Sequence, residues 1–345
     1  MRESDIRPDD VFSEYLRLSE LDATTMLELG SGFAEVPCPA CTCREQRPSF
    51  RKSGFSYVEC VACGSLFVSP RPGPSLLAQF YESSPSSLYW AEVFWPRVAE
   101  SRVEKVIRPR VQRVLQSNRI VALGGDFTAV DVGAGAGSFL FELRAAAPGI
   151  EAIAVEPGPA LAEQARVKGL RVCVSSSEDV RSWGDPADLV TAFEVIEHVY
   201  DPCAFVVSLL RFCRPGGTVL VTGLGGDGFD IRMLKSESKA ASVPHHLNFL
   251  SVRGLELMFS RAGFENISVE TPGELDVEIV SKALAAGSGE HVPDFVRVLL
   301  SERGDTEKEL LQEFLQATRM SSHAWIWATR PPVESDQESE TDAEL

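Results

Sequence analysis

The chain has 345 residues, of which 44% are hydrophobic, and this is enough for a full core and about two domains rather than a fibrous or largely disordered protein. Its formal net charge of −17 argues against a nucleic-acid partner, because such affinity comes largely from lysine and arginine side chains that neutralise phosphates. The sequence shows neither a membrane span of ~20 apolar residues nor a signal peptide, so we expect a cytoplasmic protein.

The first third of the chain divides into three segments by composition. Residues 1–33 mix acidic residues with short amphipathic runs, and we expect a helical or partly mobile leader. Residues 34–72 are rich in Cys, Pro, Gly and aromatic residues, as in a small loop-rich module. Residues 73–118 form a predicted helical linker. Apolar residues recur at helical spacing over 97–117, and we expect Pro109 to interrupt that helix.

The loop-rich module carries two C-x2-C pairs. "CPAC" and "CVAC" are separated by eighteen residues, which is the spacing at which two tight turns supply four thiolates to a tetrahedral zinc ion. We predict a structural zinc site, since four thiolates leave no open coordination position. Its ligands would be Cys38, Cys41, Cys60 and Cys63. Cys43 could replace Cys41, and four unrelated buried cysteines are the alternative. The remaining cysteines are expected in the core: Cys173, Cys203 and Cys213.

Strand-like and helical patterns alternate from residue 119 onward. The strand-like segments are "FTAVDVG", "IEAIAVEP", "LRVCVSS", "ADLVTAFE" and "GGTVLVTG". Such alternation predicts an α/β fold of the Rossmann-like, doubly wound kind, with a parallel sheet that is covered on both faces. We assign residues 119–330 to this domain.

The last part of the domain carries an insertion. After a helix that ends at Gly263 and the strand "ENISVETPG", residues 272–322 form a predicted helical insertion before the closing strand "HAWIWATRP". A lid or a contact in a homo-oligomer would explain an insertion where a hairpin is usual, and a stabilising cap is the alternative. Residues 331–345 are acidic and contain no basic residue, so we expect a disordered tail.

A glycine-rich loop follows the first strand of this domain. "AVDVGAGAGSF" places Gly133, Gly135 and Gly137 before an apolar helix, where glycines let the backbone turn sharply and approach a ligand closely. Asp131 precedes the first glycine by two residues. Glu156 closes the second strand, where a carboxylate accepts hydrogen bonds from ribose hydroxyls. The spacing is GxGxG rather than the dinucleotide GxGxxG, which makes a nicotinamide enzyme the runner-up.

The motifs of residues 119–270 resemble those of class I S-adenosylmethionine-dependent methyltransferases. In chain order they are "VDVGAGAG", "VEP", "SSSEDV", "FEVIEHV" followed by "DP", and "LLRFCRPGGTVLVTG". The resemblance implies that the loop from Asp131 lines the methionine and ribose of S-adenosylmethionine, and that Glu156 holds the ribose. The residues implied beside adenine are Ser176, Ser177 and Glu178. Phe193 would lie near the sulfonium, and plain core packing is the alternative for this side chain.

The segment "FEVIEHV" places Glu194, Glu197 and His198 at the spacing i, i+3 and i+4. These side chains share one face if a helix has already begun there. The segment resembles one in ubiquinone-biosynthesis O-methyltransferases and small-RNA 2′-O-methyltransferases, where these residues are associated with a divalent cation. The resemblance implies a site for Mg2+, Mn2+ or Zn2+ that lowers the pKa of an acceptor hydroxyl. Orientation of the loop or of the cofactor's ammonium group is the alternative.

Methyl transfer to a hydroxyl group also needs a base that removes the proton. In "VPHHLNFLS", His246 matches the family pattern of a histidine before "NFLS" and is the first candidate. His245 or His198 could substitute for it. A structural histidine is the alternative in each case.

The cysteine module followed by "FVSPRPGPSLLAQFY" resembles bacterial methyltransferases of natural-product and surface-polysaccharide pathways. This resemblance implies a small-molecule acceptor, methylated on a hydroxyl of a sugar or natural-product intermediate. Three alternatives stay open. They are a C-methyltransferase that acts on a nucleotide-sugar, an RNA methyltransferase with a zinc ribbon, and a degenerate fold that serves as a binding module.

Overall fold

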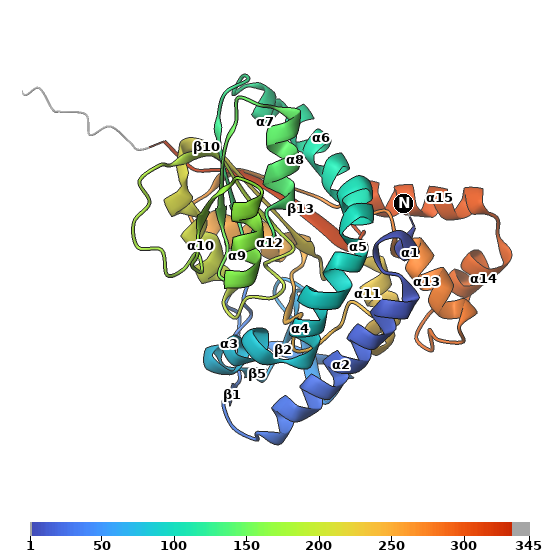
Figure 1. Cartoon of the computed structure of the whole chain (residues 1–345). Helices are drawn as coiled ribbons and strands as arrows, with labels where there is room; N and C mark the ends of the chain where they lie inside the picture. Colours follow the sequence, from blue (N-terminus) through green and yellow to red (C-terminus); the bar gives the residue numbers. More distant parts are fainter. Residues whose placement is uncertain (1, 333–345) are drawn as a thin grey trace, which may run out of the picture.

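The computed structural model describes residues 2–332, so the predicted acidic tail lies outside the described residues from position 333 onward. The protein is built around a central sheet flanked by helices (Figure 1). The sheet has seven strands in the order β12-β13-β10-β9-β6-β7-β8. Its strands are β6 (Thr128–Val132), β7 (Glu151–Val155), β8 (Arg171–Cys173), β9 (Ala187–Phe193), β10 (Cys213–Leu224), β12 (Glu265–Glu270) and β13 (His323–Thr329). The α/β fold predicted from the alternating pattern is confirmed.

The order of the strands fixes where a ligand can bind. The strands from β10 to β8 run parallel, whereas β13 pairs antiparallel with both β10 and β12. The chain order reverses between β6 and β9, where Val130 pairs with Val190. Open α/β sheets bind ligands outside the carboxyl ends of their strands at such a switch point. The glycine loop after β6 and the segment "FEVIEHV" after β9 therefore meet at this edge.

Helices cover both faces of the sheet. The face that carries Ala129 and Leu189 packs against α6, α8 and α9, and the face that carries Val130 and Val190 packs against α10 and α12. These helices are α6 (Arg108–Gln116), α8 (Ser138–Ala146), α9 (Pro159–Val167), α10 (Pro202–Phe212) and α12 (Val252–Arg261). Because neither face meets water, the strands are continuous apolar runs instead of alternating ones.

Helices from the N-terminal part form a layer beside the sheet. They are α1 (Glu3–Ile6), α2 (Asp9–Glu28), α3 (Pro74–Ser83), α4 (Pro85–Tyr89), the π-helical turn η1 (Trp90–Phe94) and α5 (Trp95–Arg102). The long helix α2 is anchored by Phe12 and Tyr15, which pack against Phe94 and Val98. Residues 9–28, part of the predicted leader, are therefore a packed helix.

Pro109 does not break the helix at its own position. The helical chain runs from α5 through a π-helical turn, η2 (Val103–Ile107), into α6, and Pro109 lies in the first turn of α6. A proline inside an α-helix removes a hydrogen bond and clashes with the preceding turn. The wider π-turn accommodates it, so the predicted interruption takes the form of a bulge.

The cysteine module shares a small sheet with a distant part of the chain. Its order is β11-β4-β3-β2, with β2 (Gln46–Lys52), β3 (Phe55–Cys60), β4 (Leu66–Val68) and β11 (Asn248–Phe249). Two shorter strands, β1 (Phe33–Ala34) and β5 (Arg71–Pro72), pair beside it. Since β11 belongs to the loop that follows β10, the module is joined to the loop that carries the candidate histidines.

Arg71 strengthens this junction from inside. Its side chain is 1% exposed and donates hydrogen bonds to Val68 O (3.1 Å), Tyr200 O (2.7 Å) and Asn248 Oδ1 (3.0 Å). Asn248 Nδ2 in turn donates to Val199 O at 2.8 Å. One buried guanidinium group therefore ties the module to β11 and to the turn that follows β9.

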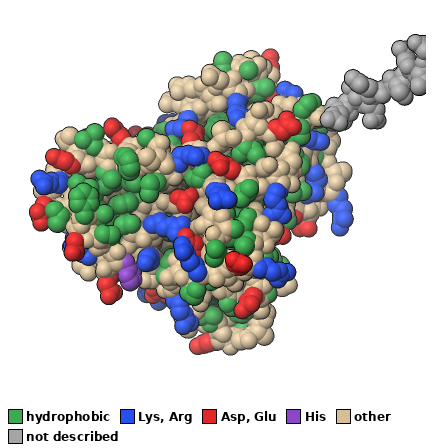
Figure 2. Space-filling view, turned by 180° about the vertical axis from the view of Figure 1, so that it is seen from behind, with side chains coloured by type: hydrophobic (Ala, Val, Ile, Leu, Met, Phe, Trp, Pro, Cys, Tyr) green, Lys and Arg blue, Asp and Glu red, His purple; other side chains and the backbone are tan. Residues whose placement is uncertain are grey.

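The helical insertion lies at one end of the molecule (Figure 1). It contains α13 (Asp276–Ala285), α14 (Asp294–Glu302) and α15 (Asp305–Ala317), which share a core with α11 (Phe229–Leu234). Figure 2 shows hydrophobic side chains gathered over this end. The exposed ones are Phe295, Val298, Leu310 and Phe314. Within residues 2–332 we find no helix with the length and apolar character needed to cross a membrane.

Replacing Arg71 with leucine should lower the free energy of unfolding by about 3 kcal/mol, because the buried oxygens of Val68, Tyr200 and Asn248 would lose their donor. Urea unfolding followed by tryptophan fluorescence measures this change. Arg44→Leu is the matched control, since Arg44 is exposed and makes no hydrogen bond or ion pair within residues 2–332. An R71L variant as stable as R44L would contradict the role given to Arg71.

Candidate active site

The glycine loop has a backbone conformation that glycine alone adopts readily. Gly133, Gly135 and Gly137 have φ angles of +72°, +55° and +70°. A Cβ on Gly133 would lie 2.5 Å from Val195 Cγ2, whereas no described atom lies within 4 Å of the corresponding position on Gly135. The loop is therefore packed at Gly133 and open at Gly135, where a ligand can approach the backbone.

Glu156 braces the loop from the neighbouring strand. Its Oε2 accepts a hydrogen bond from Gly135 N and its Oε1 accepts one from Gly158 N, both at 2.8 Å. Burial raises the pKa of this carboxyl, and the two backbone donors oppose that shift. A carboxylate has about four acceptor positions, so Glu156 can still accept hydrogen bonds from two hydroxyl groups.

Asp131 is turned into the protein. It is 3% exposed, and its Oδ1 accepts a hydrogen bond from Thr191 Oγ1 at 2.7 Å. Burial raises the pKa of Asp131 to about 7, although the hydrogen bond from Thr191 opposes the shift. This carboxyl joins β6 to β9 beneath the loop, so its contribution to a ligand site is support of the loop.

The serines expected beside adenine follow β8. Ser177 is buried and accepts a hydrogen bond from Ser208 Oγ at 2.7 Å. Ser176 Oγ donates to Asp179 Oδ2 at 2.7 Å, and Glu178 is exposed. The hydrogen bond of Ser177 thus holds the segment against α10. The side chains of Ser176 and Glu178 remain accessible at the surface.

Phe193 ends β9 at the switch point and is half-buried between two neighbours. Its ring lies 4.4 Å from the ring of Phe139, measured between centroids, and the Cζ atom of Arg110 lies 4.4 Å from the Phe193 centroid. Arg110 comes from α6, and its side chain is only 10% exposed. A cation therefore covers the residue that was expected near the sulfonium. Arg110 belongs to no motif, and no pattern in the sequence marks it as a site residue.

The chain after β9 forms a turn instead of a helix, so the condition for a shared helical face of Glu194, Glu197 and His198 is not met. Helix α10 begins only at Pro202. Glu194 has a φ of +56°, in the left-handed region, which sends its side chain away from the other two.

Glu194 is occupied by donors from three elements. Its Oε1 accepts hydrogen bonds from Arg110 Nη2 (3.1 Å), Thr222 Oγ1 (2.5 Å) and His323 Nε2 (2.7 Å). Trp325 Nε1 donates to His323 Nδ1, and since an indole is only a donor, the proton of His323 is on Nε2. Burial acts to raise the pKa of Glu194, but His323 and Arg110 hold it well below its usual range.

The structure brings together Glu197, His198 and His246, which we call the carboxylate–imidazole cluster. One potential ligand atom from each lies within 4.8 Å of the others. The cluster joins two distant segments, because Leu247 N donates a hydrogen bond to Glu197 O at 2.8 Å. Two of the three residues expected to bind a cation are thus found with His246, and Glu194 is outside the group.

Both histidines of the cluster present a bare ring nitrogen. His198 Nδ1 lies 2.9 Å from His245 O, and His246 Nδ1 lies 2.6 Å from Ala240 O. A carbonyl only accepts, so each Nδ1 carries the proton and each Nε2 is left with a free lone pair. Burial lowers the pKa of His198 to about 4 and that of His246 to about 3, which keeps both rings neutral.

Glu197 is the buried member of the cluster. It is 1% exposed, and within residues 2–332 its Oε2 has no hydrogen-bond partner. Burial raises the pKa of Glu197 well above its usual range, and the charge of Glu194 adds to the shift. A buried carboxyl oxygen without a partner is costly, and it marks a place that a cation or a ligand hydroxyl would stabilise.

His245 lies in a different environment from its neighbour. It is 5% exposed, its Nε2 is hydrogen-bonded to Ser86 Oγ at 2.8 Å, and its ring is surrounded by Tyr15, Phe80 and Tyr81. Burial lowers its pKa well below the usual range. Both the contacts and the burial are those of a packing residue.

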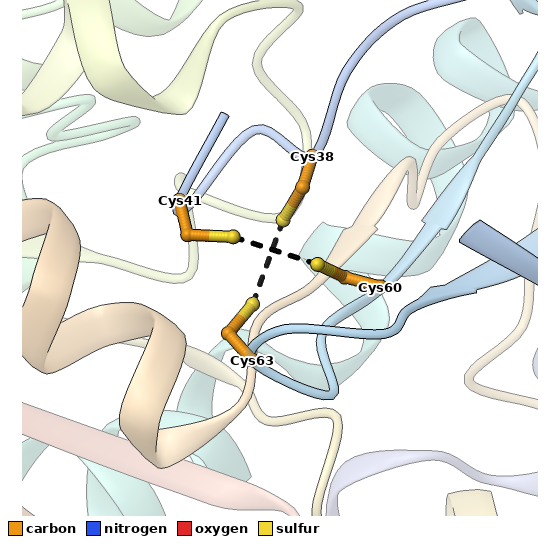
Figure 3. Close-up of side chains that lie close together, drawn as sticks. All are labelled: Cys38, Cys41, Cys60 and Cys63. Carbon is orange, nitrogen blue, oxygen red and sulfur yellow. Dashed lines mark hydrogen bonds between the residues drawn. The ribbon is translucent and has the colours of Figure 1, made fainter. Parts of the chain in front are cut away.

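The four cysteines of the two C-x2-C pairs point toward one centre (Figure 3). Cys38 Sγ and Cys63 Sγ are 3.6 Å apart, and Cys41 Sγ and Cys60 Sγ are 3.4 Å apart. These distances are too long for a disulfide, whose S–S bond is about 2.05 Å. They suit a tetrahedron of sulfurs about 2.3 Å from a zinc ion, whose edges are about 3.8 Å.

A hydrogen bond joins two thiols of this set. The hydrogen bond from Cys38 lowers the pKa of Cys63 to about 4, whereas the pKa of Cys38 is raised. Cys43 is not part of the set, and its Sγ donates to Glu45 O at 3.8 Å. Among the other cysteines, Cys213 is buried, and Cys173 and Cys203 are half-buried.

The fold and this edge define a class of protein. A glycine loop and a carboxylate-ended strand meet at the switch point of a Rossmann-like sheet whose last strand is antiparallel, as expected for an enzyme that binds an adenosyl ligand. The family described as methyltransferase domain matches residues 99–269. Residues 99–269 of the chain thus carry a methyltransferase domain, which supports the class I S-adenosylmethionine-dependent methyltransferase that the motifs predict.

Curated relatives similar to this chain are ubiquinone biosynthesis O-methyltransferases. The one from Xanthomonas oryzae pv. oryzae is 32% identical over 129 residues, which cover 34% of this chain and 53% of that protein. The one from Methylococcus capsulatus is 32% identical over 141 residues, which cover 39% of this chain and 57% of that protein. The chain thus spans about half the length of the curated relatives it matches. A solved SAM-dependent methyltransferase from Archaeoglobus fulgidus is similar at 15% identity with a TM-score of 0.45, over 68% of this chain and 99% of that one.

Replacing Cys60 with serine should reduce bound zinc to well below one ion per chain and lower the unfolding temperature, because a structural zinc site contributes directly to folding. Metal content by atomic absorption and thermal unfolding give the two readouts. Cys43→Ser is the control, and it should keep both values of the unaltered protein. Full zinc content in C60S, or its loss in C43S, would contradict the ligand set.

Proposed function

We propose that this protein transfers a methyl group from S-adenosylmethionine to a hydroxyl group of a small molecule, a sugar or natural-product intermediate. The observation that carries the proposal is the contact between Glu156 and the glycine loop. The carboxylate is held by Gly135 N and Gly158 N, and the backbone at Gly135 is open beside it. The relatives named as O-methyltransferases support a hydroxyl acceptor.

The residues present fit the cofactor. Glu156 would accept hydrogen bonds from the ribose hydroxyls, the loop from Asp131 to Gly137 would line the methionine and ribose, and the serines after β8 would lie beside adenine. Phe193 would border the sulfonium. When bound, S-adenosylmethionine supplies an electrophilic methyl group, so the protein has to position an acceptor and accept a proton.

The carboxylate–imidazole cluster suits that second task. His246 Nε2 and His198 Nε2 have free lone pairs, because each Nδ1 is held by a carbonyl. Their pKa values of about 3 and about 4 make them weak bases for an unactivated hydroxyl group. His245 is packed among aromatic rings and supports its neighbour instead of serving as the base.

A divalent cation would overcome this weakness. Glu197, His198 and His246 offer one carboxylate and two imidazoles, a donor set that favours Mn2+ or Zn2+ over Mg2+. The carbonyls that hold each Nδ1 are the outer contacts that metal-binding histidines usually have. When bound, the ion supplies a positive charge that lowers the pKa of a hydroxyl group beside it.

The cysteine set and the net charge bear on the zinc site and on the alternative functions. The cysteine set is a structural zinc site, which holds β3 and β4 and through them β11 and the histidine loop. Reduced thiols of this kind fit a cytoplasmic protein. The net charge of −17 disfavours the RNA methyltransferase alternative, and the intact glycine loop and Glu156 disfavour a degenerate binding module.

Replacing Glu156 with glutamine should weaken S-adenosylmethionine binding by tenfold or more, about 1.4 kcal/mol or above, because the amide nitrogen would face one of the two backbone N–H groups and lose ribose acceptors. Calorimetric titration of the full-length protein with S-adenosylmethionine measures this. Glu163→Gln, on the exposed face of α9, is the control. If the unaltered protein does not bind S-adenosylmethionine, the proposed function is wrong.

Replacing Glu197 with glutamine should weaken Mn2+ binding by tenfold or more, because the cluster would lose its only carboxylate. Paramagnetic resonance of free Mn2+ gives the affinity, and thermal unfolding shows whether the variant is folded. Glu290→Gln, at an exposed position, should bind Mn2+ as the unaltered protein does. Equal Mn2+ affinity in E197Q and E290Q would reject the cation site and leave methyl transfer to the histidines alone.

A further inference from the structure

Two half-buried arginines of the N-terminal layer have no anionic partner. Within residues 2–332, the arginines whose side chains form neither a hydrogen bond nor an ion pair are Arg2, Arg7, Arg44, Arg102, Arg181, Arg253 and Arg303. All of these are exposed except Arg7 and Arg102. A charge that is partly removed from water without a partner costs free energy, so an arginine in this state needs an explanation.

Helix packing brings these two arginines to one place. Ser101, which precedes Arg102 in α5, donates from its Oγ to Asp5 O at 2.5 Å, so the end of α1 lies against α5. Arg7 follows α1 directly. The Cζ atom of Arg102 lies 5.6 Å from the centroid of the Trp95 ring. Such a contact positions the guanidinium group and leaves its charge without a counter-ion.

A third cation, Lys239, lies on the same aromatic ring as Arg7. Arg7 Cζ is 5.5 Å and Lys239 Nζ is 5.8 Å from the centroid of Phe12, a buried side chain of the α2–α5 interface. Lys239 has no hydrogen bond or ion pair within residues 2–332. It precedes Ala240, whose carbonyl accepts the hydrogen bond from His246 Nδ1. The cations therefore lie beside the loop that supplies the carboxylate–imidazole cluster.

The charges near Arg102 do not balance. Burial lowers the pKa of Arg102 to about 10, and repulsion by Arg7 and Arg110 lowers it further, against a weaker attraction by Glu194. Arg7 lies near Asp230, but no ion pair joins them. Burial raises the pKa of Asp230 to about 7, so this carboxyl carries only part of a charge at neutral pH. In a chain with a net charge of −17, Arg7 and Arg102 thus keep their positive charges in half-buried positions, and the neighbouring Lys239 is exposed.

The π-helical turn η2 aligns Arg102 with Arg110. Two turns of an α-helix advance about seven residues, and the extra residue of a π-turn extends this to about eight, the separation of Arg102 and Arg110. Arg110 covers Phe193 at the switch point. Arg102 therefore lies on the same side of the helix as Arg110, two turns closer to the N-terminus.

We propose that Arg7, Arg102 and Lys239 bind a phosphate group of the methyl acceptor, so that the acceptor is a phosphorylated small molecule held beside the carboxylate–imidazole cluster. This inference rests on the proposed methyl transfer. Guanidinium groups bind phosphate oxygens through paired, charge-assisted hydrogen bonds, and an ammonium group adds a point charge. Three cations match a phosphate dianion better than a single carboxylate. The bound phosphate would also remove the repulsion that the free protein carries.

The test is calorimetric titration of the full-length protein with inorganic phosphate and, separately, with acetate. Phosphate should bind more tightly than acetate, and Arg102→Gln or Lys239→Gln should weaken phosphate binding by about tenfold or more. Arg253→Gln removes an exposed, unpartnered arginine and should bind phosphate as the unaltered protein does. Equal binding of phosphate and acetate, or equal phosphate affinity in R102Q and R253Q, would overturn the proposal.

Thermal unfolding separates a phosphate site from a structural contact. R102Q without phosphate should unfold at the same temperature as the unaltered protein or above it, because the variant loses an unpaired charge. Unfolding of R102Q at a clearly lower temperature would assign Arg102 to the support of Trp95 and overturn its role in binding.

Titration with S-adenosylmethionine separates this inference from the proposed function. R102Q and K239Q should bind S-adenosylmethionine as the unaltered protein does, because neither residue contacts Glu156 or the glycine loop. A protein that binds S-adenosylmethionine but not phosphate overturns the phosphate site alone. A protein that binds phosphate but not S-adenosylmethionine overturns the proposed methyl transfer, and with it the acceptor role of the site.

Discussion

The pairing of β11 with β4 is the constraint on which the candidate active site depends. Two residues of the loop after β10 extend the sheet of the cysteine module, and the next residues toward the N-terminus carry His246. Tyr57 OH donates to His246 O at 2.7 Å, and Val68 N donates to Leu247 O at 2.9 Å. A loop of this length would otherwise be mobile, since it has little regular structure of its own. The cysteine module is therefore a support for the site as well as a separate fold.

Two kinds of electrostatic environment occur around the candidate active site. Glu194 is surrounded by Arg110, Thr222 and His323, and its charge is fully compensated. In the carboxylate–imidazole cluster a carboxyl oxygen has no donor, and near Arg102 two guanidinium groups have no anion, among the residues that the structure describes. Folded proteins usually avoid both conditions. These two conditions are the physical reason to place ligands here in addition to packing contacts.

The N-terminal helices hold in place elements that border the candidate active site. Phe12 and Tyr15 of α2 pack on Phe94 and Val98, which fixes α5 and the π-turn that follows it. The same layer packs around His245 and carries Arg7 and Arg102. A segment that has no motif of its own thus determines how the methyltransferase fold is closed on one side, in the part of the chain that precedes the matched family region.

The sequence by itself determined the local features. The local features are the apolar strands, the glycines with positive φ and the paired cysteines. Each depends on a few neighbouring residues, so the pattern of the sequence is enough to predict it. Only the tertiary structure decided which side chains meet. Glu194 lies outside the carboxylate–imidazole cluster because its positive φ angle turns its side chain toward Arg110 and His323. His246 lies beside Glu197 because a hydrogen bond connects two segments about fifty residues apart. Such contacts depend on packing between distant elements, which no local pattern encodes.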